Sequence, residues 1–202
     1  MSCSLRGVKI ILASASPRRK DLLKGLGWEF ETVPADVPEP RVEGETPSEM
    51  VERLSLLKGR SVASRFPEAL VVASDTVVAQ DGQIFTKPAD AADALRMLTA
   101  LSGAVHHVHS GIALFWRGCE MCRSEITAVH FRALDEEYLK GYIATGEPFG
   151  KAGAYAIQGL GSLMVEGIEG DYSNVVGLPL CLLGKMMESL GFSLNRQWGV
   201  EG

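Results

Sequence analysis

Short apolar runs alternate with segments of helical pattern along the whole chain. Apolar runs bounded by turn residues predict strands over residues 8–13, 29–33, 70–79, 105–116 and 120–131. Helical patterns bounded by capping and stop signals predict helices over residues 18–26, 46–65, 90–101, 135–145 and 178–190. Because strands and helices mix throughout, the pattern predicts an α/β fold with an antiparallel component.

Local cap and turn signals support several of these boundaries. Ser16 stands at a predicted N-cap before Pro17, and residues 46–49 (Thr-Pro-Ser-Glu) form a predicted capping box. The pairs at 81–82 (Asp-Gly) and 117–118 (Arg-Gly) predict turns between strands. The pattern therefore predicts two hairpins as well as helices with defined starts.

The 202 residues contain no clean linker, internal repeat or low-complexity segment. A chain of this length fits one domain, or two lobes around one cleft that share a sheet. We therefore expect a single domain over residues 1–192 and a C-terminal tail over residues 193–202 that is frayed from residue 195. Residues 150–170 are glycine-rich, and short strands are expected there.

Composition and charge exclude some classes of function. The chain has 25 Asp and Glu residues against 20 Lys and Arg residues, a net charge of -5 that argues against a general nucleic-acid binder. No apolar run reaches the roughly 18 residues that a membrane-spanning helix needs. Four cysteines make no disulfide scaffold in a chain this long, so we expect a reducing cytoplasm. An anionic ligand would need a local cluster of cations.

The turn that follows the first predicted strand is suited to bind phosphate. Ser14 lies in this turn, and Arg18 and Arg19 occupy the first turn of the next predicted helix. Acidic residues are preferred there, because a helix N-terminus carries a partial positive charge and free N–H groups. Hydroxyl, N–H and guanidinium groups together favour a phosphate ligand. The alternative is a pair of solvated arginines on a surface helix.

Two further charged residues interrupt apolar patterns. Lys58 shares the apolar stripe of Val51 and Leu54, so it either snorkels to solvent or points into a cleft. Asp75 interrupts a strand that is otherwise buried, where a carboxylate is costly unless it is hydrogen-bonded, metal-bound or at a cleft mouth. Such a carboxylate could accept a proton from water or orient a metal. The alternative is a carboxylate that accepts backbone N–H groups in a turn.

Two later segments have weaker signals. Lys87 follows the predicted hairpin and is held by Pro88, which restricts the backbone, although a plain loop lysine explains the same pattern. Residues 153–161 contain small residues that permit close approach to a ligand, and Gln158 alone among them both donates and accepts hydrogen bonds. Gln158 therefore suits the edge of a base, while a tight structural turn remains the alternative.

Two attractive patterns predict no site. Cys119 and Cys122 have zinc-ligand spacing, but no second ligand pair follows at a suitable distance. The histidines His106, His107 and His109 lie in a strand pattern, where we expect exposed strand or hairpin contacts rather than a metal. The chain also contains no Walker loop, dinucleotide-binding glycine motif or serine nucleophile elbow.

Six segments together resemble the Maf family of nucleoside triphosphate pyrophosphatases, a family first associated with septum formation. They are residues 12–19 (LASASPRR), 74–78 (SDTVV), 87–88 (KP), 101–103 (LSG), 151–159 (KAGAYAIQG) and 175–179 (VVGLP). Each is weak alone, but the segments occur in the family's order, and the resemblance extends over about residues 8–192.

The resemblance implies a fold, a reaction and a ligand. The fold would be α/β, with a central mixed twisted sheet, helices on both sides and two lobes around one cleft. The reaction would hydrolyse a nucleoside triphosphate to the monophosphate and pyrophosphate with a divalent metal cation, Mg²⁺ or Mn²⁺. The ligand would be a small nucleotide rather than a nucleic-acid polymer or a membrane, and the family resemblance allows a homodimer.

The resemblance also assigns roles to particular residues. Asp75 matches the family's proton acceptor, and Glu39 matches a carboxylate that helps to place metal or water, so the implied metal residues are Glu39 and Asp75. The positions implied to bind the phosphates are Ser14, Arg18, Arg19, Lys58 and Lys87.

Substrate preference is implied by a second set of positions. Arg18, Thr76 and Gln158 match positions that separate the family's subgroups, and they resemble the subgroup that acts on dTTP and UTP. The subgroup that acts on 7-methyl-GTP typically has a bulky aromatic residue at the position of Arg18. One small departure is Ser74, where alanine is usual.

The sequence favours one of three functions. The leading hypothesis is a pyrophosphatase for dTTP, UTP and modified pyrimidine nucleotides, and the other two are alternatives. The second is a pyrophosphatase for 7-methyl-GTP or for purine nucleotides of the ITP type. The third is a nucleotide-binding regulator of cell division.

Overall fold

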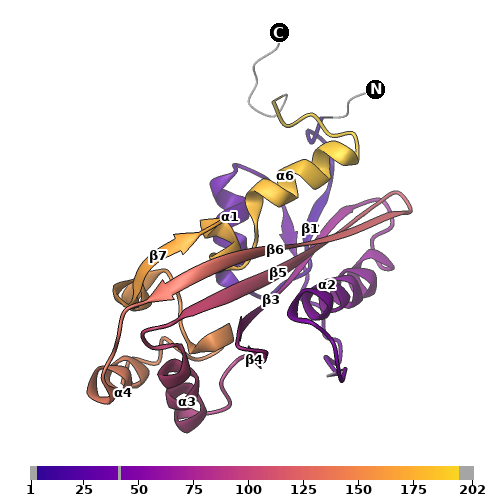
Figure 1. Cartoon of the computed structure of the whole chain (residues 1–202). Helices are drawn as coiled ribbons and strands as arrows, with labels where there is room; N and C mark the ends of the chain where they lie inside the picture. Colours follow the sequence, from indigo (N-terminus) through magenta and orange to yellow (C-terminus); the bar gives the residue numbers. More distant parts are fainter. Residues whose placement is uncertain (1–3, 41, 196–202) are drawn as a thin grey trace.

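A computed structural model describes residues 4–40 and 42–195, which form a seven-stranded mixed sheet with the strand order β2-β1-β3-β5-β6-β7 and with β4 on the edge of β3 (Figure 1). The strands are β1 (Ile10–Leu12), β2 (Glu31–Thr32), β3 (Leu70–Gln80), β4 (Gln83–Phe85), β5 (Val105–Trp116), β6 (Cys119–Phe131) and β7 (Val165–Glu169). The α-helices are α1 (Pro17–Gly25), α2 (Pro47–Ala63), α3 (Ala91–Leu101), α4 (Glu136–Ala144), α5 (Tyr172–Val176) and α6 (Leu180–Ser189). Two 3₁₀ segments, η1 (Ala152–Ala154) and η2 (Gly159–Met164), precede β7.

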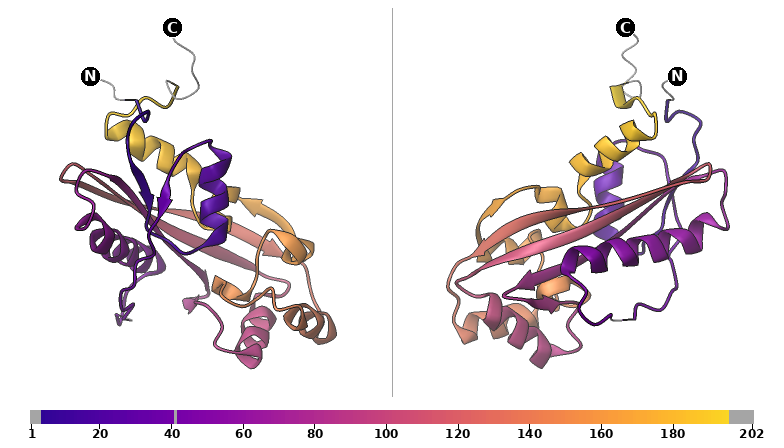
Figure 2. Two further views of the ribbon diagram at one scale, coloured as in Figure 1. Left: turned by 180° about the vertical axis from the view of Figure 1, so that it is seen from behind. Right: turned by 45° about the vertical axis from the view of Figure 1, so that its right-hand side comes forward.

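Helices cover both faces of the sheet (Figure 2). Successive side chains of a strand point to opposite faces. On β3, Val72 therefore packs with Leu23 of α1 and Leu183 of α6, whereas Val71 packs with Val62 of α2. The expectation of an α/β fold with a mixed sheet and helices on both sides is confirmed.

A third cluster of buried residues forms a second lobe at the far end of the long strands. It contains Val78 of β3, Phe85 of β4, Leu98 of α3 and Leu139 of α4. Figure 1 shows α3 and α4 at this end, away from α1 and α6. Because β3, β5 and β6 run through both lobes, the two lobes share one sheet, as expected.

A gap between the two lobes lies along one edge of β3. Strand β1 pairs with β3 in parallel only as far as Val72, and β4 pairs with it in antiparallel fashion only from Val78 onward. Asp75 and Thr76 lie between these limits, so neither described strand covers them on this edge. The sheet thus leaves a short stretch of β3 open to a ligand.

Close packing sets the position of α2 above β5. A Cβ atom on Gly111 of β5 would lie 2.4 Å from the carbonyl oxygen of Val51 and 2.8 Å from Oγ of Ser55, and one on Gly59 of α2 would lie 2.1 Å from the ring of Phe115. Only glycine permits these approaches. The close contact holds α2, and Lys58 with it, against the sheet.

Most predicted boundaries agree with the structure. The capping box is confirmed, since the amide of Glu49 donates to the Thr46 hydroxyl and the Thr46 amide donates to the Glu49 carboxylate. The predicted turn before β4 is also confirmed, with positive φ angles of 48° at Asp81 and 78° at Gly82.

Other predictions need correction. The short helix α5 was not expected, and residues 150–170 form two 3₁₀ segments and one strand rather than several strands. Positive φ angles at Gly153 and Ala154 turn the chain there, which a strand pattern does not anticipate. Of the predicted frayed tail, residues 196–202 lie outside the described residues. No helix within residues 4–40 and 42–195 has the length and apolar character needed to cross a bilayer.

Candidate active site

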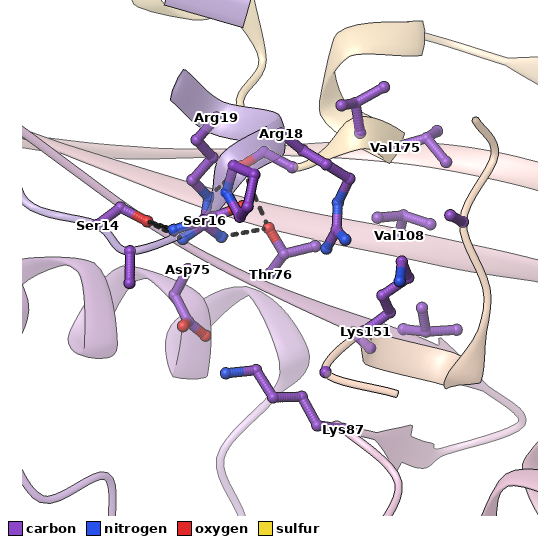
Figure 3. Close-up of a pocket in the computed structure, with 18 of the residues that line it drawn as sticks. Ser14, Ser16, Arg18, Arg19, Asp75, Thr76, Lys87, Val108, Lys151 and Val175 are labelled. Carbon is purple, nitrogen blue, oxygen red and sulfur yellow. Dashed lines mark hydrogen bonds between the residues drawn. The ribbon is translucent and has the colours of Figure 1, made fainter. Parts of the chain in front are cut away.

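A cavity of about 360 Å³ opens at the gap in the sheet (Figure 3). It is lined by residues 13–19, 34–35, 39, 58, 75–76, 78, 87, 108, 150–152, 155–158 and 175–177. These segments come from both lobes and from distant parts of the chain. Every residue that the sequence singled out for a site lies on this list: Ser14, Arg18, Arg19, Glu39, Lys58, Asp75, Thr76, Lys87 and Gln158.

Arg19 ties the first helix to β3 and to the loop after α5. Its Nε donates to the carbonyl of Gly177 at 2.7 Å, and its Nη1 donates to the Ser74 carbonyl at 2.7 Å and to the Ser14 hydroxyl at 3.3 Å. Its Nη2 donates to Oγ1 of Thr76 at 2.9 Å. These bonds use four of the five N–H donors of a guanidinium group. Arg19 therefore organises the cavity wall, and its binding of phosphate stays a prediction.

The Thr76 hydroxyl belongs to the same network. It lies 2.8 Å from the Ser110 hydroxyl, which itself donates to the carbonyl of Asn174 at 3.1 Å. Oγ1 of Thr76 accepts from Arg19, and its own proton goes either to the Ser110 hydroxyl or to the carbonyl of Gly177, which lies 3.4 Å away. The Thr76 proton is thus engaged within the protein, and the role of Thr76 in substrate preference stays a prediction.

Successive side chains of a strand point to opposite faces, so Asp75 points away from the network of Thr76 and Arg19, toward the other wall of the cavity. Its Oδ1 lies 2.5 Å from Nζ of Lys58, and Oε1 of Glu39 lies 2.8 Å from the same Nζ. Lys58 and Asp75 are nearly buried, with side-chain exposures of 13% and 12%, whereas the Glu39 side chain is 45% exposed. Lys58 thus points into the cleft and does not snorkel to solvent, and Asp75 is in an ion pair rather than a turn.

The two carboxylates on Lys58 fit a divalent cation that also binds substrate. Within the described residues, no group of three or more His, Cys, Asp or Glu side chains could hold a metal ion alone. Mg²⁺ usually takes one or two carboxylates from a protein and completes its shell with water and substrate phosphates. Asp75 and Glu39 supply two carboxylates at the cavity wall, both in contact with Nζ of Lys58, so they match this requirement in number and kind.

Arg18 and Lys151 form a second cationic centre. Figure 3 shows the two side chains converging on one side of Thr76, with Asp75 on the other side. Arg18 makes no hydrogen bond or ion pair with any residue in the described part of the chain, whereas Nζ of Lys151 donates to the backbone carbonyl of Glu147. Burial lowers the pKa of Arg18, and burial followed by repulsion from Arg18 lowers the pKa of Lys151.

Glu147 holds the segment that bears Gln158. Its carboxylate accepts the amides of Leu160 at 3.1 Å and Gly161 at 2.8 Å, and the Tyr142 hydroxyl at 2.9 Å. Burial alone would raise the pKa of Glu147, but these hydrogen bonds outweigh it and the pKa is lowered. The exposed Gln158 side chain makes no hydrogen bond with another described residue, so its amide is available to a ligand.

Lys87 completes the cations of the cavity. It follows β4, is exposed, and extends toward the side of the cavity where Asp75 lies (Figure 3). The next residue, Pro88, is buried and fixes the backbone at this point.

Sequence reasoning missed Lys151. The residue belongs to the glycine-rich segment from which Gln158 was chosen, but no local pattern distinguishes it from a surface lysine. Only its approach to Arg18, about 130 residues away in the chain, reveals it.

The expectation for the histidines was wrong for two of the three. His106 is fully buried, where its Nε2 lies 2.8 Å from the hydroxyl of Tyr155, and His109 is nearly buried, where its Nδ1 lies 3.0 Å from Oγ of Ser48. His107 is exposed as expected. An apolar pattern interrupted by imidazoles resembles an exposed strand, but the covering helices and the Tyr155 segment bury this one.

The fold and the cavity define an α/β protein that gathers cations beside two carboxylates, an arrangement suited to a polyphosphate ligand. Residues 9–190 match the model of the family described as Maf-like protein, and the chain belongs to this family.

Relatives of known name are similar over almost the whole chain. A dTTP/UTP pyrophosphatase of Syntrophotalea carbinolica is 54% identical over 187 residues, which cover 90% of this chain and 84% of the relative. A dTTP/UTP pyrophosphatase of Koribacter versatilis is 46% identical over 185 residues, which cover 92% and 96%. Among solved structures, a nucleoside-triphosphatase (dITP/XTP pyrophosphatase) of Mycobacterium abscessus aligns with a TM-score of 0.44 at 19% identity over 91% of this chain and 98% of its own.

Proposed function

We propose that this protein hydrolyses dTTP and UTP to the nucleoside monophosphate and pyrophosphate. The family and the names of the relatives support this reaction. The observation that carries it is the convergence of Asp75 with the cations of four separate segments on one cavity. A triphosphate bears a charge of about -4, which these cations offset in a chain whose net charge is -5.

Asp75 acts on the attacking water. The water oxygen forms a bond to the α-phosphorus while the bond from that phosphorus to the bridging oxygen breaks, and pyrophosphate leaves with the electron pair. Asp75 accepts the proton of the water and later releases it to solvent. Lys58 holds the Asp75 carboxylate in place through the 2.5 Å contact. Because water attacks the phosphorus directly, no covalent intermediate is needed.

Mg²⁺ or Mn²⁺ would be held by Asp75 and Glu39 together with substrate oxygens. When bound, such a cation offsets phosphate charge and favours the ionised form of a nearby water. Around it, Lys58 and Lys87 neutralise phosphate oxygens, and Ser14 offers a buried hydroxyl beside the N-terminus of α1.

The base is read at Gln158. Its free amide can donate to one carbonyl of a uracil or thymine ring and accept the ring N–H, and Glu147 holds the backbone on which it stands. Arg18 and Thr76 shape the neighbouring wall. This set favours dTTP and UTP over substrates of the 7-methyl-GTP or ITP type.

A panel of nucleotides tests the substrate. We expect pyrophosphate release from dTTP and UTP with Mg²⁺ or Mn²⁺ at a kcat/KM at least about tenfold above that for 7-methyl-GTP and ITP. Faster turnover of either purine nucleotide would refute the substrate assignment and favour the second candidate activity.

Replacement of Asp75 separates an enzyme from a nucleotide-binding regulator. We expect Asp75→Asn to bind dTTP but to lose at least about 10²-fold in kcat. The control is Asp21→Asn, an exposed residue of α1 outside the cavity. A smaller fall for Asp75→Asn would remove the general base from the mechanism.

Three broader points belong to the same proposal. Residues 1–192 constitute one catalytic domain, which the family match over 9–190 supports. The enzyme works in the cytoplasm, in keeping with free thiols at Cys119, Cys122 and Cys181. A homodimer stays a prediction that sedimentation would test.

A further inference from the structure

The loop that bears Glu39 is held at two points, and helix α2 supplies both. Nζ of Lys58 lies 2.8 Å from the Glu39 carboxylate, and Nη2 of Arg53 donates to the backbone carbonyl of Pro40 at 3.1 Å. Among the described residues, no other hydrogen bond or ion pair reaches residues 36–44. An ion pair to a carboxylate as exposed as that of Glu39 contributes little alone. The bond from Arg53 therefore matters for the position of the loop.

Arg53 is itself fixed by the residue that ends this loop. Its Nε and Nη2 donate to the two carboxylate oxygens of Glu45, each at 2.6 Å, and the Glu45 side chain is only 10% exposed. Such a bidentate pair is stronger and more directional than an ordinary surface ion pair. Glu45 directly precedes Thr46, whose capping box fixes the start of α2. The guanidinium group is thus held on the helix, and the second N–H of Nη2 points to Pro40.

The prolines on both sides of Glu39 carry this anchor to its side chain. Pro38 and Pro40 each have a φ angle that the ring locks, and a residue that precedes proline is restricted to extended conformations. The backbone from Pro38 to Pro40 is therefore stiff. A hydrogen bond to the Pro40 carbonyl restricts the position of Glu39 more than it would in a chain without these prolines.

We propose that Arg53, fixed by Glu45, is a positioning residue that holds Glu39 against Lys58 at the cavity wall. The inference rests on the proposed function, since it gives Glu39 a part in hydrolysis. Arg53 is not among the residues that line the cavity, so it acts through Glu39 and not on the substrate. Helix α2 then carries both side chains that place Glu39.

The first test is ¹⁵N relaxation of the free protein, which needs neither nucleotide nor metal. We expect an order parameter of about 0.8 for the Glu39 amide in the wild type and below about 0.6 in Arg53→Met. The matched control is Arg60→Met, which removes a bidentate pair from the same helix, because Arg60 binds Glu120 of β6 instead of the loop. It should leave the Glu39 amide unchanged. A value below about 0.6 in the wild type, or the same value in Arg53→Met as in the wild type, overturns the proposal.

The second test is a double-mutant cycle on kcat/KM for dTTP. We expect Arg53→Met and Glu39→Gln each to lower kcat/KM by at least about tenfold, the usual effect of losing a residue that orients a ligand-binding group. Added to Glu39→Gln, Arg53→Met should cost less than about a further twofold, because the residue through which it acts is already changed. Arg60→Met should stay within about twofold of the wild type.

A second variant protects the test against simple misfolding. Arg53→Met leaves the nearly buried Glu45 carboxylate unpaired, whereas Arg53→Met/Glu45→Gln removes both charges. We expect the double variant to give the same order parameter and the same loss in kcat/KM as Arg53→Met. The circular dichroism of each variant shows that the fold is retained.

The outcomes separate this proposal from the proposed function. Unchanged kcat/KM in Arg53→Met, or a loss that adds in full to that of Glu39→Gln, overturns the positioning role of Arg53 even if dTTP is hydrolysed. A wild-type protein that releases pyrophosphate from no nucleotide overturns the proposed function instead, and the relaxation experiment still decides whether Arg53 holds the loop.

Discussion

Adjacent arginines of α1 are expected to differ sharply in their effect on stability. Arg19 donates four hydrogen bonds that join α1 to β3 and to Gly177, whereas Arg18 donates none to any described residue. Replacement by methionine keeps the length of the side chain and removes the guanidinium group. We expect Arg19→Met to destabilise the fold strongly and Arg18→Met to leave stability nearly unchanged.

The magnitude follows from the contacts of Arg19. A hydrogen bond from a charged group contributes roughly 1.5–3 kcal/mol, and a buried acceptor that is left without its donor costs roughly 1–3 kcal/mol. The four bonds share one side chain, so their contributions do not add fully. We expect Arg19→Met to lower the free energy of unfolding by about 3–5 kcal/mol. In a chain of this length that corresponds to a fall in Tm of about 6–20 °C.

Urea unfolding of the free protein, followed by circular dichroism, measures this difference. Arg18→Met should stay within about 1 kcal/mol of the wild type, because no bond to protein is lost. The same variant should raise the KM for dTTP, because the cation faces the cavity. A loss below about 1 kcal/mol for Arg19→Met, or equal losses for both variants, would show that the hydrogen-bond network does not set the stability.

Two further predictions follow from packing and from burial. Gly111→Ala places a methyl group against the backbone of α2, so we expect a loss of about 1–3 kcal/mol in unfolding free energy and a fall in kcat/KM as α2 shifts; Gly141→Ala, in open space on α4, should instead stabilise by about 0.5–1 kcal/mol in the same urea assay. Burial, followed by repulsion from neighbouring histidines, lowers the pKa of His106 from 6.5 to about 3. The unfolded state therefore binds the proton first, and stability should fall by about 3 kcal/mol between pH 6.5 and about pH 4. The double variant His106→Phe/Tyr155→Phe should lose this part of the pH dependence in unfolding experiments, and an unchanged slope would contradict the assignment.

Local patterns anticipated much of the fold. The capping box at Thr46, the turn at Asp81 and the long apolar strand around Asp75 depend on neighbours in sequence, and the structure confirms them. The segment of η1 and η2 was not anticipated, because its turns are fixed by contacts such as that of Gly153 with Val78. The burial of His106 was missed for the same reason.

The sequence by itself determined which residue types were available to the site. A carboxylate in an apolar strand, two arginines at a helix start and a lysine on an apolar helix stripe are visible along the chain, because each conflicts with its local pattern. Only the tertiary structure decided which of these residues contact one another and which face the cavity. Strand alternation directs Asp75 to Lys58 and Thr76 to Arg19, and the break between β1 and β4 opens the cavity between them. The partnership of Arg18 and Lys151 joins two lobes, and no spacing along the chain encodes it.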